Sequence, residues 1–210
     1  MQNLKNYWNK FKYILLLVSI LFSPVFTYNS YSDDLQQGNK LILEMIAKAQ
    51  KHALETIELS SEDRSKKITP LINSYINLDF MAKATTGSFW KKATDDQKTK
   101  YKLALLHQIV NTIEDHLNTL ATMTYKPLSS ELRGKKLIYV RGVIEDRKKN
   151  NPPINLLWKL SKGKDETFGI LDLEIEGISL VRSHKHETTS ILRKNKGDFN
   201  HLIEKLKIKK

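Results

Sequence analysis

The sequence predicts an α+β fold, a twisted antiparallel sheet of about four strands with helices packed on one face. From residue 33 to about 121, apolar residues recur at spacings of three and four, which is the period of amphipathic helices. From about residue 137 to 175 the period changes to two, in short β-branched runs separated by turns, which is typical of an antiparallel meander. A last apolar pattern, at residues 188–206, predicts helices interrupted at Gly197.

The first 32 residues resemble a secretory signal peptide. Three lysines precede an apolar run of about ten residues, and a small-x-small step ends at Ser32. A membrane-spanning helix needs roughly 20 apolar residues, so the pattern favours a cleaved signal over an uncleaved anchor. We therefore expect a signal peptide at residues 1–32, a single domain at residues 33–210, and a periplasmic location.

Composition narrows the class of protein. With 210 residues, 40% hydrophobic and 28% charged, the chain is neither collagen-like nor wholly disordered. The absence of cysteine excludes a disulfide framework, a thiolate zinc site and a cysteine nucleophile. The net charge is +12, and removing the three lysines of the signal leaves +9. This charge suits an anionic membrane or an acidic protein, and export makes nucleic acid a less favoured partner.

In the helical half, residues 33–59 form the first amphipathic segment. Residues 77–94 predict short helical turns. Thr94 and Gln97 have the three-residue spacing of a capping box, and they begin the longest predicted helix, roughly residues 95–121.

In the second half, residues 123–128 alternate only weakly between apolar and polar side chains. Residues 137–145, 154–160 and 168–175 alternate more clearly and are separated by turn residues, so they predict three strands. Residues 179–181 either continue the sheet or turn away from it.

The residues that could carry catalysis or bind metal are few. His184 and His186 form a His-x-His pair for which the sequence supplies no third metal ligand. Glu174 and Glu176 lie on the polar face of a predicted strand, where solvated carboxylates are more common than a catalytic pair. There is also no glycine-rich phosphate loop and no Gly-x-Ser-x-Gly motif. We expect no catalytic residue, no metal and no cofactor, so an enzyme is the weaker hypothesis.

Two segments resemble a known family. The first is Asn77-Leu78-Asp79-Phe80-Met81-Ala82 with Gly87, Trp90, Ala93, Thr94 and Gln97; the second runs from Asp172 to Val181 and is followed by Gly197-Asp198 and Leu202-Ile203. In order and spacing these residues resemble the MlaC family, also called the toluene-tolerance family. The resemblance extends over residues 33–206.

The resemblance implies a periplasmic phospholipid carrier. Such a carrier is the soluble component of an ABC transport system that maintains outer-membrane lipid asymmetry. Its implied partners are diacyl phospholipid as cargo, an outer-membrane lipoprotein–porin complex, and an inner-membrane ABC transporter with its periplasm-facing ring protein. We expect a monomer, and nucleic acid is not among the expected partners.

A lipid carrier needs apolar surface beyond what its own core requires. A diacyl lipid has about thirty tail methylenes, so exposing the tails to water costs ~24 kcal/mol at ~0.8 kcal/mol each. The candidate lining residues are Phe80, Met81, Trp90, Leu105, Ile109, Ile113, Ile138, Val140, Leu156, Trp158, Leu171 and Leu173. Their pattern alone fits a filled core as well as a lined cavity, and the resemblance favours the cavity.

Three other functions compete with the carrier. A periplasmic protein-binding adaptor or chaperone of similar fold would use the sheet face for peptide. A lipid hydrolase would need a nucleophile–base pair, which the sequence does not supply. Nucleic-acid binding through the basic residues 190–210 would depend strongly on salt. The same basic residues would gain about 1 kcal/mol each near an anionic bilayer, or they form an ordinary solvated end of the chain.

Overall fold

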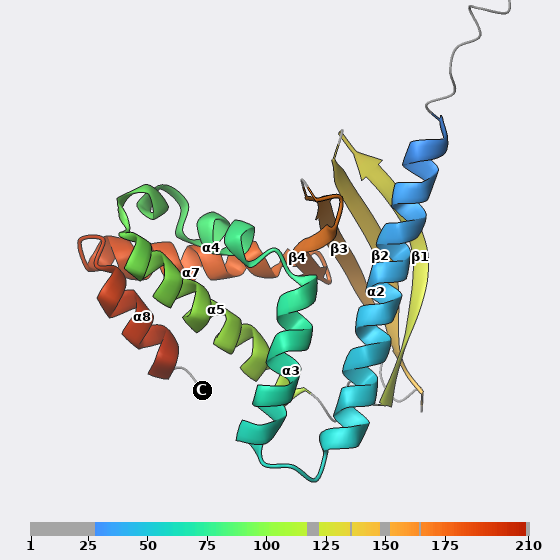
Figure 1. The fold of residues 1–210 in the computed structure, drawn as a ribbon, viewed down its shortest axis with the longest axis horizontal. Coiled ribbons are helices and arrows are strands. Elements are labelled where there is room, and N and C mark those ends of the chain that lie inside the picture. Colours follow the sequence, from blue (N-terminus) through green and yellow to red (C-terminus); the bar gives the residue numbers. More distant parts are fainter. Residues whose placement is uncertain (1–27, 117–121, 135, 148–151, 164, 209–210) are drawn as a thin grey trace, which may run out of the picture. The chain divides into compact units, whose positions relative to one another are not determined.

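A computed structural model describes residues 28–116, 122–134, 136–147, 152–163 and 165–208 (Figure 1). Contacts divide the chain into Met1–Asp33 and Asp34–Lys210. The predicted signal peptide lies outside the described residues except for residues 28–32, which are helical. Helix α2 (Tyr28–Thr56) begins in the first unit, and all the side chains discussed below belong to the second. Over the described residues, every helix is too short or too polar to cross a membrane.

The element order is helices, then strands, then helices. The helical elements are α2 (Tyr28–Thr56), α3 (Ser61–Tyr75), α4 (Leu78–Thr86), the 3-10 helix η1 (Gly87–Lys92), α5 (Asp95–Asp115), α7 (Leu180–Lys194) and α8 (Phe199–Ile208). The strands are β1 (Met123–Arg133), β2 (Leu137–Asp146), β3 (Ile154–Lys162), β4 (Phe168–Ile175) and β5 (Ile178–Ser179). They form one antiparallel sheet in the order β1-β2-β3-β4-β5. The predicted α+β meander is confirmed, with five strands instead of about four because the two-residue β5 joins the edge.

The longest predicted helix begins where its capping box places it. The Thr94 hydroxyl accepts the Gln97 N–H, and the Gln97 side chain accepts the Thr94 N–H. The helix ends at Asp115, and residues 117–121 of the predicted helix lie outside the described residues.

The helix after the sheet begins eight residues earlier than predicted. Ser179 is its N-cap, and the Ser179 hydroxyl accepts the Arg182 N–H at 3.0 Å. The chain therefore leaves the sheet directly into α7 at Leu180. The predicted break at Gly197 is confirmed, since this residue has φ 83° and separates α7 from α8.

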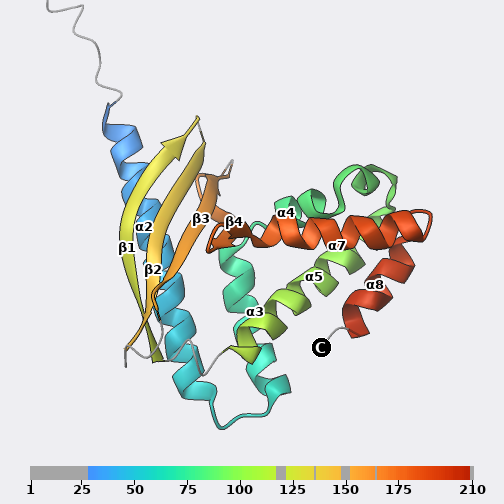
Figure 2. The same cartoon turned by 180° about the vertical axis from the view of Figure 1, so that it is seen from behind.

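Two groups of helices contact the sheet differently. Along the sheet lies α2, joined to β1 by hydrogen bonds from Asn39 to Ser130 and from Gln50 to Met123 (Figures 1 and 2). The other group consists of α4, α5, α7 and α8, which pack on one another and reach the sheet at β4. Between the two groups, α3 contacts both α5 and β4.

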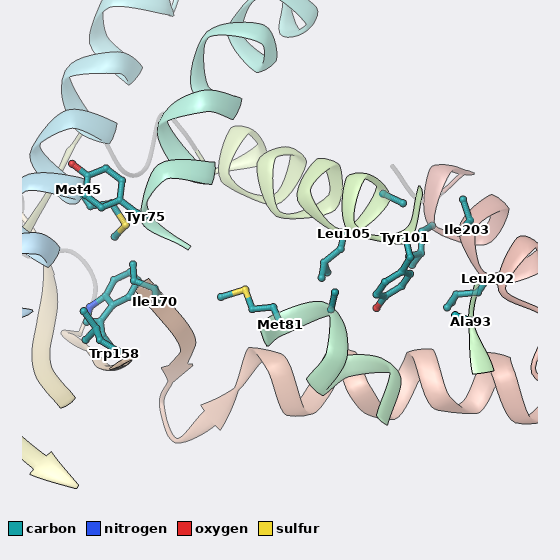
Figure 3. Close-up of a cluster of buried hydrophobic side chains, with 14 of the residues drawn as sticks. Met45, Tyr75, Met81, Ala93, Tyr101, Leu105, Trp158, Ile170, Leu202 and Ile203 are labelled. Atoms are coloured by element: carbon teal, nitrogen blue, oxygen red, sulfur yellow. The ribbon is translucent and has the colours of Figure 1, made fainter. Parts of the chain in front are cut away.

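The buried core is continuous but has two sides (Figure 3). We call the buried residues of α2, Tyr75 and the sheet the sheet-side core: Ile42, Met45, Tyr75, Ile138, Val140, Leu156, Trp158, Leu160 and Ile170. We call those of α4, α5, α7, α8 and Ala93 the helix-side core: Met81, Ala82, Ala93, Tyr101, Ala104, Leu105, Leu192, Phe199, Leu202, Ile203 and Leu206. In Figure 3, Met81 lies between the two groups. A smaller cluster, made of Ala53, Ile68, Ile72, Leu106 and Val110, joins α2, α3 and α5.

Candidate functional site

The sheet has one apolar face, which we call the inner face. On it, Ile138 and Val140 of β2 stand opposite Leu160 and Trp158 of β3. All four side chains are buried, and Leu156 continues the row along β3. These residues occupy every second position of their strands because successive side chains point to opposite faces, and the intervening Tyr139, Leu157 and Lys159 point to the other face.

A bulge in the pairing of β3 with β4 changes which residues of β4 face inward. Leu160 stands opposite Ile170, whereas Trp158 stands opposite Leu173. The extra residue, Leu171, is buried but does not belong to the main apolar cluster. Strict alternation predicted Leu171 and Leu173 on one face, and the bulge adds Ile170 to that face instead.

Helices α2 and α3 cover the inner face. A Cβ added to Gly38 would lie 3.2 Å from Ile138 Cγ2, so glycine permits the close approach of α2 to β2. Met45 and Tyr75 lie over the sheet near Trp158 (Figure 3). At the surface, Lys48 Nζ donates to Tyr75 Oη at 2.9 Å, and this hydrogen bond raises the pKa of Lys48.

Within the sheet-side core, Tyr125 crosses over a glycine. A Cβ added to Gly142 would lie 2.4 Å from Tyr125 Cε2, so only glycine leaves room for the ring there. Burial raises the pKa of Tyr125 to about 12, and hydrogen bonding to the neighbouring Trp158 partly opposes this rise. By geometry, however, neither Tyr125 Oη nor Trp158 Nε1 has a well-formed hydrogen bond to any described residue, although both atoms are buried. The two polar groups are therefore neighbours without a good partner.

In the helix-side core, the hydroxyl of the buried Tyr101 has a hydrogen-bond partner. Tyr101 Oη and Thr85 Oγ1 are 2.8 Å apart, and Thr85 Oγ1 donates to the Met81 carbonyl at 2.7 Å. The Tyr101 ring makes edge contacts with Trp90 and Phe199, with ring centroids 6.4 and 6.1 Å apart. Burial raises the pKa of Tyr101, and its hydrogen bond to Thr85 opposes the rise. The Tyr101 hydroxyl is therefore satisfied, whereas the buried Thr188 hydroxyl on α7 has no hydrogen-bond partner among the described residues.

The predicted lining residues fall into several groups. The sheet-side core and the residues packed on it include Ile138, Val140, Leu156, Trp158 and Leu173, while Met81, Trp90 and Leu105 belong to the helix side. Ile109 and Ile113 pack against the smaller cluster, and Ile109 also packs against the main one. Phe80 is 43% exposed. The structure thus brings together the predicted strand residues except Leu171, but it distributes the predicted helix residues.

Sequence reasoning missed several residues of the inner-face environment. Met45, Tyr75 and Tyr125 were not among the predicted lining, yet all three pack there. A glycine inside a strand signals a close approach by another group, and Gly142 could have pointed to Tyr125.

The second motif of the family resemblance attaches α7 to the sheet. The buried Asp172 carboxylate accepts hydrogen bonds from Ser179 Oγ at 2.7 Å and from the Val181 N–H at 3.1 Å. Lys159 Nζ donates to Asp172 at 3.0 Å and also to Glu174. These motif residues therefore act in folding, because the carboxylate anchors the first turn of α7.

The first motif joins α4 to the sheet. The Asn77 N–H donates to the Ile170 carbonyl at 2.9 Å, and the Asn77 side chain accepts the Phe80 N–H at 2.9 Å. A Cβ added to Gly169 would lie 3.1 Å from Asn77 Cβ, so this glycine allows the close junction. The junction also turns Phe80 outward at the start of α4.

Two pockets on the surface of the described residues are lined by none of the predicted tail-binding residues. One, of about 430 Å³, is polar and lies between the α3–α4 junction and the β3–β4 turn. The other, of about 500 Å³, lies on α7 and is basic; it is lined by Arg182, Lys185, His186, Thr189, Ser190, Arg193 and Lys194. The tail-binding cavity stays a prediction that requires the inner face to open.

Comparisons with known proteins agree with this architecture. A family model described as "MlaC protein" matches residues 40–208. The fold is similar to that of a phospholipid-binding protein from Ralstonia solanacearum, solved in complex with a phospholipid, with a TM-score of 0.69 and 15% sequence identity. The match covers 82% of this chain and 94% of that one. No curated protein sequence matches this chain significantly.

Proposed function

The chain belongs to the MlaC family, and from this premise we propose that it is a phospholipid carrier and not an enzyme. It would bind one diacyl phospholipid and shield the tails from water during passage between the two membranes of the envelope. The observation that carries the proposal is the family match over residues 40–208. The likeness to a fold that holds a phospholipid in another protein supports it.

We place the lipid tails between the inner face of the sheet and its helical cover. The inner face presents aliphatic side chains from three strands, and α2 and α3 lie over them. The main apolar cluster is continuous from Ile42 of α2 to Leu206 of α8. Tails can enter if α2 and α3 move outward from the sheet, because hydrocarbon can replace the apolar contacts that hold them there. The hydrogen bonds from Asn39 to Ser130 and from Gln50 to Met123 would break in this movement.

The finer parts of the proposal concern location and partners. Cleavage after residue 32 would release the domain into the periplasm. There it would receive lipid from, or deliver it to, an outer-membrane lipoprotein–porin complex and an inner-membrane ABC transporter with its ring protein. The basic pocket on α7 suits an anionic surface during these encounters.

Lipid extraction tests the proposal. Protein exported to the periplasm is purified without detergent and is analysed by native and denaturing mass spectrometry. The proposal predicts about one phospholipid per chain in the native spectrum, and a denatured mass that corresponds to residues 33–210. Folded protein that never carries phospholipid, even after incubation with vesicles, would contradict it. If such lipid-free protein protects unfolded clients from aggregation, the adaptor function is supported instead.

A further inference from the structure

The inner face holds two buried hydrogen-bond donors for which no described residue supplies an acceptor in good geometry. Trp158 is 9% exposed, and its indole nitrogen is buried. The Tyr125 hydroxyl is also buried, on the neighbouring side of Gly142. No described residue forms a geometrically sound hydrogen bond with either atom.

Counting donors shows that the two groups cannot satisfy each other. An indole N–H only donates, whereas a tyrosine hydroxyl donates one hydrogen and accepts others. If the Trp158 N–H turns toward Tyr125 Oη, the tyrosine hydrogen still lacks an acceptor among the described residues. Buried polar groups in native proteins are almost always paired, so a missing acceptor indicates a ligand atom or a water.

The surroundings limit the chemistry of that acceptor. The inner-face residues of β2 and β3 next to the pair are aliphatic, among them Val140 and Leu156, and they carry no cation. An anionic phosphate buried there would be unpaired and strongly disfavoured. A neutral carbonyl oxygen accepts hydrogen bonds and has no charge to bury. In a phospholipid, such an oxygen occurs in the ester that begins each acyl tail.

We propose that Tyr125 and Trp158 form a donor pair that binds an acyl-ester carbonyl oxygen of the bound phospholipid. This inference rests on the proposed function, and it adds the position of the lipid within the site. The ester end of one tail lies against β1–β3, beside Gly142, and the hydrocarbon continues along the inner face. The pair would thereby select acyl esters over ether-linked lipids.

A competition between two lipids tests the donor pair. Delipidated protein is offered an equimolar vesicle mixture of a diester and a diether phospholipid with the same headgroup and chain lengths, and the retained lipids are measured by mass spectrometry. We expect the wild-type protein to retain the diester about three- to tenfold more, the factor given by one hydrogen bond. Tyr125→Phe removes only the hydroxyl and leaves the Trp158 N–H, so we expect its preference for the diester to be clearly smaller than that of the wild-type protein.

Tyr139→Phe is the matched control. Tyr139 is on the same sheet, opposite Lys159 in the strand pairing, and its ring lies 5.8 Å from the Arg133 guanidinium and 5.9 Å from Lys159 Nζ. This variant should keep the wild-type preference. The indole N–H resonance of Trp158 should also shift when diester lipid is bound and shift less with diether lipid, with Trp90 as the internal reference.

The outcomes separate the inference from the proposed function. Equal retention of both lipids by the wild-type protein, or an undiminished ester preference in Tyr125→Phe, overturns the donor pair and leaves the carrier function standing. Retention of neither lipid by folded wild-type protein contradicts the carrier function itself.

Discussion

Tyr101 lies in the continuous core and the partly buried Tyr125 packs against it, but the hydroxyl groups of the two residues have different surroundings. Tyr101 pairs with Thr85, which in turn donates to the Met81 carbonyl. The buried Tyr125 hydroxyl has no hydrogen-bond partner among the described residues, and the Trp158 indole lies beside it. The Tyr101 hydroxyl is therefore satisfied within the helix-side core, although the buried Thr188 hydroxyl of α7 has no hydrogen-bond partner among the described residues. On the sheet side, the Tyr125 hydroxyl and the Trp158 indole N–H both lack one.

This difference suggests how one small domain can both fold and hold cargo. The helix-side core closes around Tyr101, Phe199 and Leu202, and these contacts stabilise the fold whether or not a ligand is present. On the sheet side, two buried donors lack an acceptor among the described residues, and we infer that the bound lipid supplies it. Substitutions on the two sides should therefore have separable effects, on stability in one case and on lipid retention in the other.

The largest expected effect is the loss of bound lipid in the variant Leu173→Glu. Leu173 is partly buried on the inner face opposite Trp158, so a carboxylate there would project into the tail-binding region. We expect the folded variant to lose more than about nine-tenths of the bound phospholipid, measured by lipid extraction. Leu103→Glu introduces the same charge at a position that is 54% exposed on α5, and it should retain lipid. Wild-type lipid content in folded Leu173→Glu would show that this side chain does not face the tails.

The next largest expected effect is a loss of folding stability in the variant Leu202→Ala. Leu202 is fully buried in the helix-side core, and truncation of such a leucine costs about 2–5 kcal/mol. Urea unfolding of delipidated protein measures this loss. Phospholipid bound per folded molecule should be unchanged, and a matching loss of lipid would mean that the two sides are not separable.

A smaller effect distinguishes the two tyrosines directly. In delipidated protein, Tyr101→Phe should lower the free energy of unfolding by about 1 kcal/mol because it removes a satisfied hydrogen bond. Tyr125→Phe removes a hydroxyl without a good partner, so it should be neutral or slightly stabilising. Thermal unfolding of both variants makes the comparison, and a larger loss for Tyr125→Phe would contradict the difference between the two sides.

The smallest effect concerns high pH. The pKa of Tyr125 is raised from 10.0 to about 12, so the folded protein keeps its hydroxyl protonated where the unfolded chain loses the proton. The resulting stabilisation is fully present below pH 10 and is lost as the pH rises toward 12. The melting temperature of delipidated wild-type protein should therefore fall more steeply across this window than that of Tyr125→Phe. Parallel curves would mean that the Tyr125 hydroxyl is not buried in solution.

The order of helices and strands could be predicted from the sequence because the apolar residues of helices and of strands recur with different periods. Each period continues over a whole segment of the chain. The capping box at Thr94 and the break at Gly197 were also local signals, and both are confirmed. The start of α7 was missed because Ser179 both ends β5 and caps the helix, while its hydroxyl also donates to Asp172 on the neighbouring strand β4.

The residues of the inner face could be predicted where apolar and other side chains simply alternate along a strand. They were missed where the register between two strands shifts. Val140 and Trp158 follow alternation in β2 and β3. Ile170 lies on the inner face because of the bulge in the β3–β4 pairing. The Tyr125 ring can lie over β2 toward Trp158 only because Gly142 has no side chain. Such relations depend on the register between strands, which one strand's pattern does not contain.

Hydrogen exchange in loaded and delipidated protein tests the account most directly. If lipid lies between the inner face and its helical cover, loading should slow amide exchange mainly in α2, α3 and β1–β3, while α5 and α8 exchange alike in both forms. A change centred on α5 and α8, or none in α2 and the sheet, would contradict the placement of the lipid on the sheet side.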